Sequence, residues 1–223
     1  MSTEPAYAGP MEVAYRTEVG HVRQRNEDAL LARPERGLLA VADGLGGHPA
    51  GDVASLTAIR ALDGSGLTGE SSDGELLDAI RAAHDAVVSA GEEDDSRLGL
   101  GTTLVVALVR EGAVTVAHVG DSRAYVLPAS GELEPVTRDH SVHGYLTQAL
   151  GLDRAVMPDT AQVPAPRGTR LLLCSDGLTN MVEAEAIGEL LAHGSAQDAC
   201  DALVKAALDA GGIDNVTVIV LAF

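Results

Sequence analysis

Five carboxylate residues stand in short polar motifs scattered over the sequence, and each motif has a composition suited to holding a metal ion. They are Glu27, Asp43, Asp121, Asp176 and Asp214. Most follow or precede runs rich in Val, Leu and Ala, so we expect them at strand ends, where side chains can converge on one side of a sheet. Carboxylates a few ångströms apart repel strongly unless cations neutralise them. The pattern therefore predicts a hard-cation site that supports hydrolysis.

The clearest of these motifs is an Asp-Gly pair at the end of an apolar run, and it occurs twice. Asp43 is followed by Gly44, and Asp176 is followed by Gly177. Glycine lets the backbone approach an ion closely. A carboxylate and the next carbonyl oxygen then form a compact pair of hard ligands. The alternative is an ordinary Asp-Gly turn, but the chain's other Asp-Gly pairs lie in polar loops.

Two of the carboxylates also have a simpler explanation. Asp214 precedes the apolar run 216–220 and could be a turn residue between a helix and a strand. Asp121 lies between Gly120 and Ser122 and could form a turn in which it pairs with Arg123. The residues alone leave both alternatives open.

The chain also offers groups that could bind a phosphate and protonate a leaving oxygen. A guanidinium can orient a phosphate through two parallel hydrogen bonds, and both Arg23 and Arg25 precede Glu27. Local chemistry does not choose between these two arginines. His48 is the nearest candidate in sequence for a general acid, and a metal-coordinated water is its competitor. We expect His84 to lie on a solvated helix face.

Composition limits the class of protein. The 223 residues are 46% hydrophobic, which is enough for the core of one large domain. The formal net charge of −18 disfavours nucleic acid and anionic membranes as partners, because phosphates need a basic face. The first ten residues lack the features of a signal peptide, and no apolar run is long enough to span a bilayer. Cys174 and Cys200 indicate no disulfide framework, so we expect a cytoplasmic location.

Periodicity predicts the elements that must position the carboxylates. Helices are expected at 51–62, 76–90, 184–192 and 197–210. Strands are expected at 13–17, 30–33, 38–41, 103–110, 114–119, 123–127, 133–136, 161–163, 169–174 and 216–222. Short turns between successive strands predict antiparallel sheets, and paired helices are expected to cover their outer faces. Residues 1–10 are expected to form a flexible arm, and 11–223 a single domain of α+β class.

Taken together, the motifs resemble those of the bacterial protein phosphatase 2C (PPM) family of metal-dependent serine/threonine protein phosphatases. The resemblance runs in family order from about residue 11 to 223. The matching segments are Val22-Arg23…Asn26-Glu27-Asp28, Val41-Ala42-Asp43-Gly44-Leu45-Gly46-Gly47-His48, Gly101-Thr102-Thr103, Val119-Gly120-Asp121-Ser122-Arg123-Ala124-Tyr125, Thr137-Arg138-Asp139-His140-Ser141, Thr147-Gln148-Ala149-Leu150-Gly151, Cys174-Ser175-Asp176-Gly177-Leu178 and Asp214-Asn215-Val216-Thr217.

The resemblance implies a four-layer αββα sandwich, in which pairs of helices flank two packed antiparallel sheets. It implies two Mn²⁺ or Mg²⁺ ions bridged by Asp43. Glu27 and the Gly44 carbonyl would serve one ion, and Asp176 and Asp214 the other. The ions would activate water for the hydrolysis of phosphoserine and phosphothreonine in proteins.

The resemblance also assigns further roles and exposes one departure. Asp121 matches a residue that helps to hold a weaker third ion, and Arg23 matches the phosphate-binding arginine. The family's catalytic histidine does not align cleanly with His48. The flap segment that family members carry after Ser141 is shortened here to residues 142–146.

Two activities are compatible with this resemblance. The first is a phosphatase, expected to be a monomer, whose partners are phosphorylated proteins made by a bacterial serine/threonine kinase. The alternative is a metal-binding pseudo-phosphatase that acts as a regulatory or interaction module. The intact set of ligand residues favours the enzyme.

Overall fold

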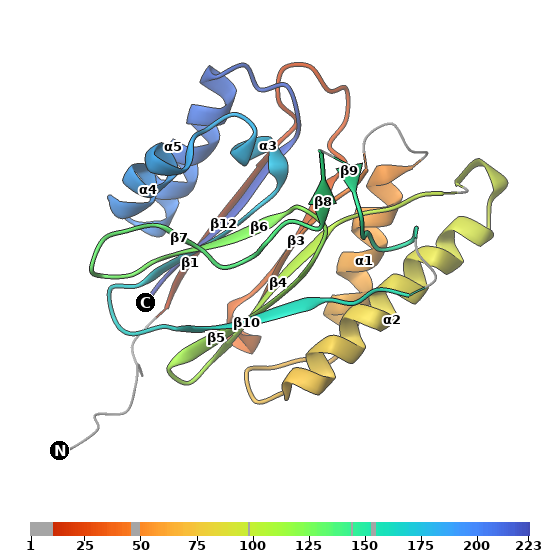
Figure 1. The fold of residues 1–223 in the computed structure, drawn as a ribbon, viewed down its shortest axis with the longest axis horizontal. Coiled ribbons are helices and arrows are strands. Elements are labelled where there is room, and N and C mark those ends of the chain that lie inside the picture. The colour runs from red at the N-terminus through yellow and green to blue at the C-terminus, as the bar shows by residue number, and fades with distance from the viewer. Residues whose placement is uncertain (1–10, 46–49, 98, 144, 153–154) are drawn as a thin grey trace.

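Two antiparallel sheets packed face to face form the centre of the computed structural model, which describes residues 11–45, 50–97, 99–143, 145–152 and 155–223. The first sheet has the strand order β1-β12-β11-β6-β7, and the second has β10-β5-β4-β3-β2 (Figure 1). The strands of the first sheet are β1 (Glu12–Glu18), β6 (Arg123–Leu127), β7 (Glu134–Pro135), β11 (Arg170–Cys174) and β12 (Val216–Ala222). Those of the second are β2 (Asp28–Arg33), β3 (Leu38–Asp43), β4 (Leu104–Arg110), β5 (Ala113–Val119) and β10 (Asp159–Pro164).

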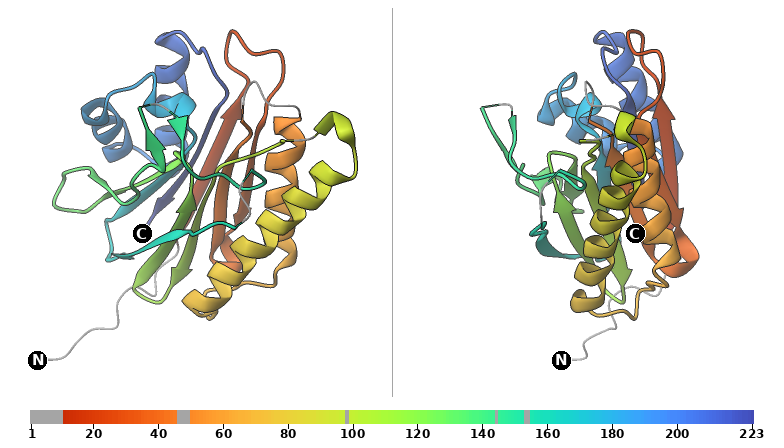
Figure 2. Two further views of the ribbon diagram at one scale, coloured as in Figure 1. Left: turned by 45° about the vertical axis from the view of Figure 1, so that its right-hand side comes forward. Right: turned by 90° about the vertical axis from the view of Figure 1, so that its right-hand side faces the viewer.

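Helices cover the outer face of each sheet. Helices α1 (Gly51–Gly64) and α2 (Asp73–Glu92) lie on the second sheet, and α4 (Ala184–Ala192) and α5 (Ala196–Asp209) lie on the first. The remaining helical segments are short: η1 (Pro34–Arg36), η2 (Asp95–Arg97) and α3 (Asp176–Thr179). Figure 2 shows the two helix pairs on opposite sides of the sheets. The predicted α+β sandwich with four layers, αββα, is therefore confirmed.

Three apolar layers hold the sheets and helices together. Strand β11 illustrates them, since Leu171 and Leu173 enter the layer between the sheets while Leu172 enters the layer beneath α4 and α5. Strand β4 does the same on the other side, with Val105 between the sheets and Val106 under α1 and α2. Strands buried on both faces read as continuous apolar runs. This explains why the sequence revealed these strands so clearly.

Caps define the starts of two helices. Ser72 accepts a hydrogen bond from the backbone N–H of Glu75, and the Glu75 carboxylate accepts one from the Ser72 N–H. Ser195 and Asp198 form the same reciprocal capping box at α5. Each box satisfies backbone donors that a helix leaves unpaired at its first turn.

The main differences from the expected elements are small. The strand expected at 133–136 is reduced to the two residues of β7, and the helical turn α3 was not expected. Strands β8 (Ser141–Val142) and β9 (Tyr145–Leu146) pair as a short hairpin, which stands away from the sheets (Figure 2). This hairpin occupies the place of the shortened flap. The expected N-terminal arm, 1–10, lies outside the described residues.

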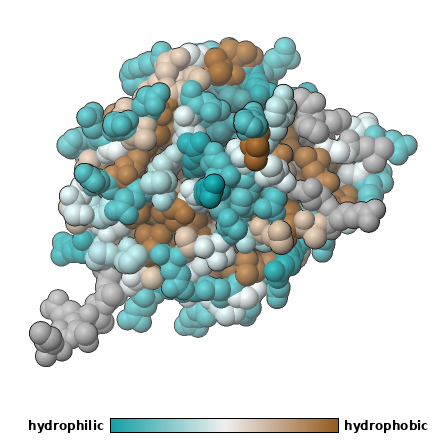
Figure 3. Space-filling view, in the orientation of Figure 1, coloured by the Kyte–Doolittle hydropathy of each residue, from teal (hydrophilic) through white to brown (hydrophobic). Residues whose placement is uncertain are grey.

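The face seen in Figure 1 is mostly hydrophilic, with separate apolar patches (Figure 3). In the part of the chain that the structure describes, no helix is both long and apolar enough to cross a membrane.

Candidate metal centre

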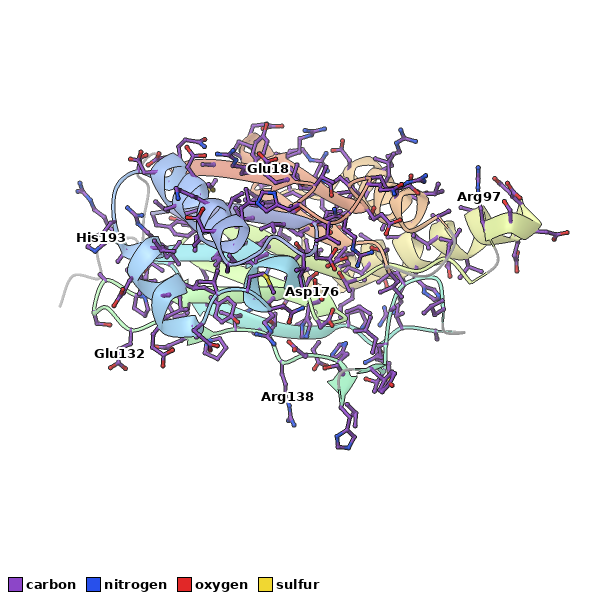
Figure 4. All side chains as sticks on the ribbon, turned by 90° about the horizontal axis from the view of Figure 1, so that it is seen from above. Glu18, Arg97, Glu132, Arg138, Asp176 and His193 are labelled. Atoms are coloured by element: carbon purple, nitrogen blue, oxygen red, sulfur yellow. The ribbon has the colours of Figure 1, made fainter. Side chains whose placement is uncertain are left out.

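The predicted carboxylates come from both sheets. Asp43 ends β3, Asp121 follows β5, Asp176 follows β11, and Asp214 precedes β12. Figure 4 shows Asp176 between the two helix pairs, on the same side of the sheets as neighbouring acidic and polar side chains. Segments far apart in the sequence therefore bring their carboxyl groups into one region.

The electrostatics of Asp43 show how close these carboxyl groups are. Burial raises the pKa of Asp43 well above its ordinary value, and repulsion from Asp28, Asp176 and Asp121 raises it further. The carboxyl groups of Asp43 and Asp176 lie within reach of each other, and their contact raises the pKa of Asp43 while it lowers that of Asp176. Two carboxylates this close repel each other strongly unless a proton or a cation neutralises one of them.

The neighbouring carboxyl groups are perturbed in the same direction. Burial and the charge of Asp214 raise the pKa of Asp176. Burial and the charge of Asp176 raise the pKa of Asp121 to about 6. Each of these pKa shifts is caused in part by another of the carboxylates, which places Asp43, Asp121, Asp176 and Asp214 in a single electrostatic cluster. Glu27 joins this cluster through the backbone.

Glu27 and Gly44 lie side by side because two chain segments approach very closely. The Gly44 N–H donates to the Glu27 carbonyl at 3.1 Å. A Cβ on Gly44 would lie 2.3 Å from the carbonyl oxygen of Gly51, and one on Gly51 would lie 3.3 Å from the Glu27 carboxyl carbon. Only glycine fits at such separations. The glycine predicted on chemical grounds is therefore also required by packing.

Arg23 reaches the same cluster, and Arg25 does not. Arg23 Nη2 donates to Asp214 Oδ2 at 2.7 Å, and Nη1 lies 4.0 Å from Glu27 Oε2. Arg25 instead pairs with Asp52 at 3.6 Å, and its side chain is 69% exposed. The tertiary structure thus separates two arginines that the sequence could not distinguish by local chemistry.

Asn215 fastens the loop that carries Arg23 and Glu27. Its side-chain oxygen accepts from the Glu27 N–H at 2.8 Å, and its amide nitrogen donates to the carbonyls of Val19 and Arg25. The Asn215 side chain is buried, so these three bonds are protected from water. The Asp214-Asn215 pair is consequently more than a turn, because it fixes the arginine loop against β12.

A sixth carboxylate, Asp28, also lies in this cluster, although the sequence motifs assigned it no role. Asp28 lies directly opposite Asp43 in the β2–β3 register. Its Oδ2 accepts from Ser175 Oγ at 2.8 Å and from Thr217 Oγ1 at 2.6 Å, and burial raises its pKa to about 6. Its Oδ1 is buried without a hydrogen-bond partner among the described residues. Alternation along β2 was the available signal, since Asp28 is in phase with the inward-facing Leu30.

Other expectations need correction or fall outside the described residues. Arg123 does not pair with Asp121; it forms two hydrogen bonds of 2.8 Å with Asp139. His84 is buried rather than solvated, and its Nδ1 accepts from the Gly151 N–H at 3.2 Å. His48, the candidate general acid, lies outside the described residues.

The cluster has the donor chemistry that hard divalent cations require. It gathers carboxylate oxygens whose charged forms are disfavoured by burial and by one another, and among the described residues Arg23 and the more distant charge of Arg123 act against this repulsion. Two guanidinium groups do not offset this many carboxylates. The unpartnered Asp28 Oδ1 adds an acceptor with unused capacity. These features fit Mn²⁺ or Mg²⁺ ions.

Comparison with known proteins gives concordant matches. A family model described as Protein phosphatase 2C matches residues 18–209. The "Serine/threonine phosphatase stp" of Listeria innocua is 36% identical, with 95% of each chain covered. The alignment spans 241 positions, more than the 223 residues of this chain, so the relative carries residues that this chain lacks.

A second relative also has a solved structure. The "Serine/threonine protein phosphatase PstP" of Mycobacterium tuberculosis is 36% identical over 94% of this chain and 44% of the relative. The crystal structure of the PstP catalytic domain "in complex with 2 Manganese ions" superposes with a TM-score of 0.87 at 36% identity, covering 95% of this chain and 97% of that one.

Proposed function

The chain belongs to the protein phosphatase 2C family, and from that premise we propose that its clustered carboxylates hold the ions with which it works. It is a metal-dependent protein phosphatase that removes phosphate from serine and threonine residues of proteins. Its cofactors are Mn²⁺ or Mg²⁺ ions. The pseudo-phosphatase alternative is not favoured.

The proposed ligand set has two parts. Asp43 bridges two ions, with Glu27 and the Gly44 carbonyl at one and Asp176 and Asp214 at the other. The closeness of Asp43 and Asp176 supports this assignment, because two carboxylates that repel each other in a buried place favour a cation between them. Such ions, when bound, activate water as a nucleophile and offset the charge of the phosphate.

Two further roles extend this set. Asp121 is proposed to help hold a weaker third ion, which its closeness to Asp176 supports. Asp28 is proposed to orient the ligands from behind, because its Oδ2 is fixed by Ser175 and Thr217 while Oδ1 has no partner among the described residues. His48 stays our candidate for the general acid.

Arg23 is proposed to bind the substrate phosphate. Its guanidinium is held at Asp214 and is 37% exposed, so it can reach solvent while attached to the cluster. If Asp214 serves a cation, the arginine becomes free to form paired hydrogen bonds with a phosphate. Its charge then stabilises negative charge that develops during hydrolysis.

The single observation that carries the assignment is that strand ends from both sheets place Asp43 in one buried cluster with Asp28, Asp176 and Asp121. The test is hydrolysis of p-nitrophenyl phosphate and of a phosphothreonine peptide with Mn²⁺, with and without a chelator. Asp43→Ala should abolish activity and Mn²⁺ binding together. Asp78→Asn, at a side chain that is 77% exposed on α2, serves as the matched control and should retain both. A folded wild-type protein inert with Mn²⁺ and Mg²⁺ would refute the assignment.

The biological setting is proposed on more general grounds. We propose that the substrates are products of a bacterial serine/threonine kinase and that the protein is a cytoplasmic monomer. The two free, buried cysteines support a reducing compartment. The charge of −18 disfavours nucleic acid and membranes as partners. We propose that 11–223 form one domain, because β1 pairs with β12 from the other end of the chain.

A further inference from the structure

A second group of polar side chains lies beside the carboxylate cluster. His118, His140 and Asp159 each bring one potential ligand atom within 4.8 Å of the others. The two imidazole rings are stacked, with centroids 4.5 Å apart, and are 4% and 9% exposed. Buried imidazoles in such an arrangement either hold a cation or hold one another in a defined orientation.

The hydrogen bonds of the two rings decide between these possibilities. His118 Nε2 donates to the Arg138 carbonyl at 2.9 Å, while the Arg138 side chain projects away into solvent (Figure 4). His140 Nδ1 accepts from the Gly120 N–H at 3.3 Å. A neutral imidazole that accepts at Nδ1 carries its hydrogen on Nε2. That nitrogen lies 3.3 Å from Asp159 Oδ2 without forming a hydrogen bond to it, and a nitrogen that bears hydrogen does not bind a metal ion.

His140 therefore acts on Gly120, the residue before Asp121. The backbone N–H of His140 donates to the Gly120 carbonyl at 2.9 Å, so His140 satisfies both backbone groups of this glycine. Gly120 has a φ of +102°, and a Cβ there would lie 2.7 Å from the Thr103 Cβ. The turn that contains Gly120 therefore packs against Thr103, just before β4, and is hydrogen-bonded to His140.

The same histidine anchors the shortened flap. Its carbonyl accepts from the Thr147 N–H at 2.7 Å, just beyond β9, and Gln148 Nε2 lies 3.4 Å from its Nδ1. His140 consequently joins the Asp121 turn, the hairpin and the edge strand β10. Polar groups behind a ligand commonly fix the ligand's direction, and their loss weakens metal binding.

We propose that His140 is a positioning residue that, by holding the Gly120 backbone, directs the Asp121 carboxylate toward Asp176. The inference rests on the proposed role of Asp121 in holding the weakest ion. His140 touches neither substrate nor reacting atoms and acts only through the Gly120 backbone. Its effect should therefore fall on one ion and leave the two ions bridged by Asp43 in place.

The test compares three substitutions of His140 by calorimetric titration with Mn²⁺. His140→Asn keeps an acceptor at the Nδ1 position and should bind the weakest ion within about threefold of wild type. His140→Phe keeps the ring without the acceptor, and His140→Gln moves the acceptor to the Nε2 position. Both should weaken that ion by about 10–100-fold while the two tighter ions stay bound. Asp121→Ala should lose the same ion.

His84→Phe is the matched control, because it removes a similar bond, which the Gly151 N–H donates to the buried Nδ1 of His84 on α2. It should lower thermal stability without changing the affinity for the weakest Mn²⁺. If a folded His140→Phe protein binds the weakest ion with wild-type affinity, the inference is wrong. It is also wrong if His140→Phe loses an ion that Asp121→Ala still binds. A wild-type protein that binds only two ions would instead contradict the proposed role of Asp121 itself.

Discussion

The metal-free protein should become less stable as the pH rises from 4.5 to 7. Asp28 and Asp121 each have a folded-state pKa of about 6, above the ordinary value of 3.8. The folded protein therefore binds more protons than the unfolded chain between these values. Consequently the free energy of unfolding falls as the pH rises through this window, and it stays low above pH 6. Other carboxylates, such as Asp73 beside Arg110, have a lowered pKa in the folded protein. They change the free energy of unfolding only below about pH 4, which is outside the range of pH 4.5 to 7.

The magnitude follows from the size of the shift. Between pH 4.5 and 7, Asp121 alone contributes about 2 kcal/mol, since each pKa unit corresponds to about 1.4 kcal/mol. For a chain of this length, that change corresponds to about 4–8 °C in Tm. The other buried carboxylates act in the same direction.

The assay is thermal unfolding of chelator-treated protein at several pH values, with Asp121→Asn as the test variant. The fall in Tm with rising pH should be about 4–8 °C smaller in Asp121→Asn than in wild type. In Asp78→Asn, at its exposed site, the fall should be the same as in wild type. Saturating Mn²⁺ should raise the wild-type Tm at pH 7, because the ions bind only the folded protein. His118 acts in the opposite direction over this range, because burial lowers its pKa. A fall in the metal-free Tm that is as large in Asp121→Asn as in wild type would therefore show that the Asp121 carboxylate is not destabilised as described.

Two more predictions separate the site from its surroundings. Arg23→Ala should lower kcat/KM for a phosphothreonine peptide by about 10²–10³-fold through lost charge stabilisation. Arg25→Ala should change kcat/KM less than about threefold, because Arg25 pairs with Asp52 instead. Equal losses for the two variants in steady-state assays would contradict the separation of the two arginines. Gly44→Ala should weaken Mn²⁺ binding and lower the Tm, because the added Cβ would lie 2.3 Å from the Gly51 carbonyl oxygen. In Gly64→Ala the added Cβ would have no described atom within 4 Å, so Mn²⁺ binding should stay unchanged and the Tm should stay the same or rise slightly. Calorimetry and thermal unfolding would check this pair, and equal effects of the two substitutions would refute the packing argument.

Secondary structure was predictable where burial on both faces made strands uniformly apolar. Strands 123–127 and 216–222 and helix 184–192 appear at the expected boundaries. The polar strand near residue 134 was harder, because β7 is short and exposed and its residues carry little apolar pattern. The turn α3 was hidden because Asp-Gly suits a loop as well as a first helical turn.

The errors at the site share a physical cause. Arg123 stands two residues from Asp121 yet binds Asp139, and Asp28 was given no role although Ser175 and Thr217 both donate to it. Side-chain partners of this kind are selected by sheet register and by the direction in which a turn leaves its strand. Alternation along a strand indicates which face a side chain takes, but it does not say which residues of other strands and loops will meet it there.

The sequence by itself determined the kind of chemistry, because Asp-Gly pairs after apolar runs and an arginine before Glu27 are chemical requirements that local motifs express. Short turns between apolar runs also indicated antiparallel sheets covered by helices, and the family resemblance implied the four-layer sandwich. Only the tertiary structure decided which groups meet: Arg23 rather than Arg25 at Asp214, and His140 behind the Asp121 turn. Those choices depend on contacts between segments far apart in the chain, which exist only once the two sheets have packed together.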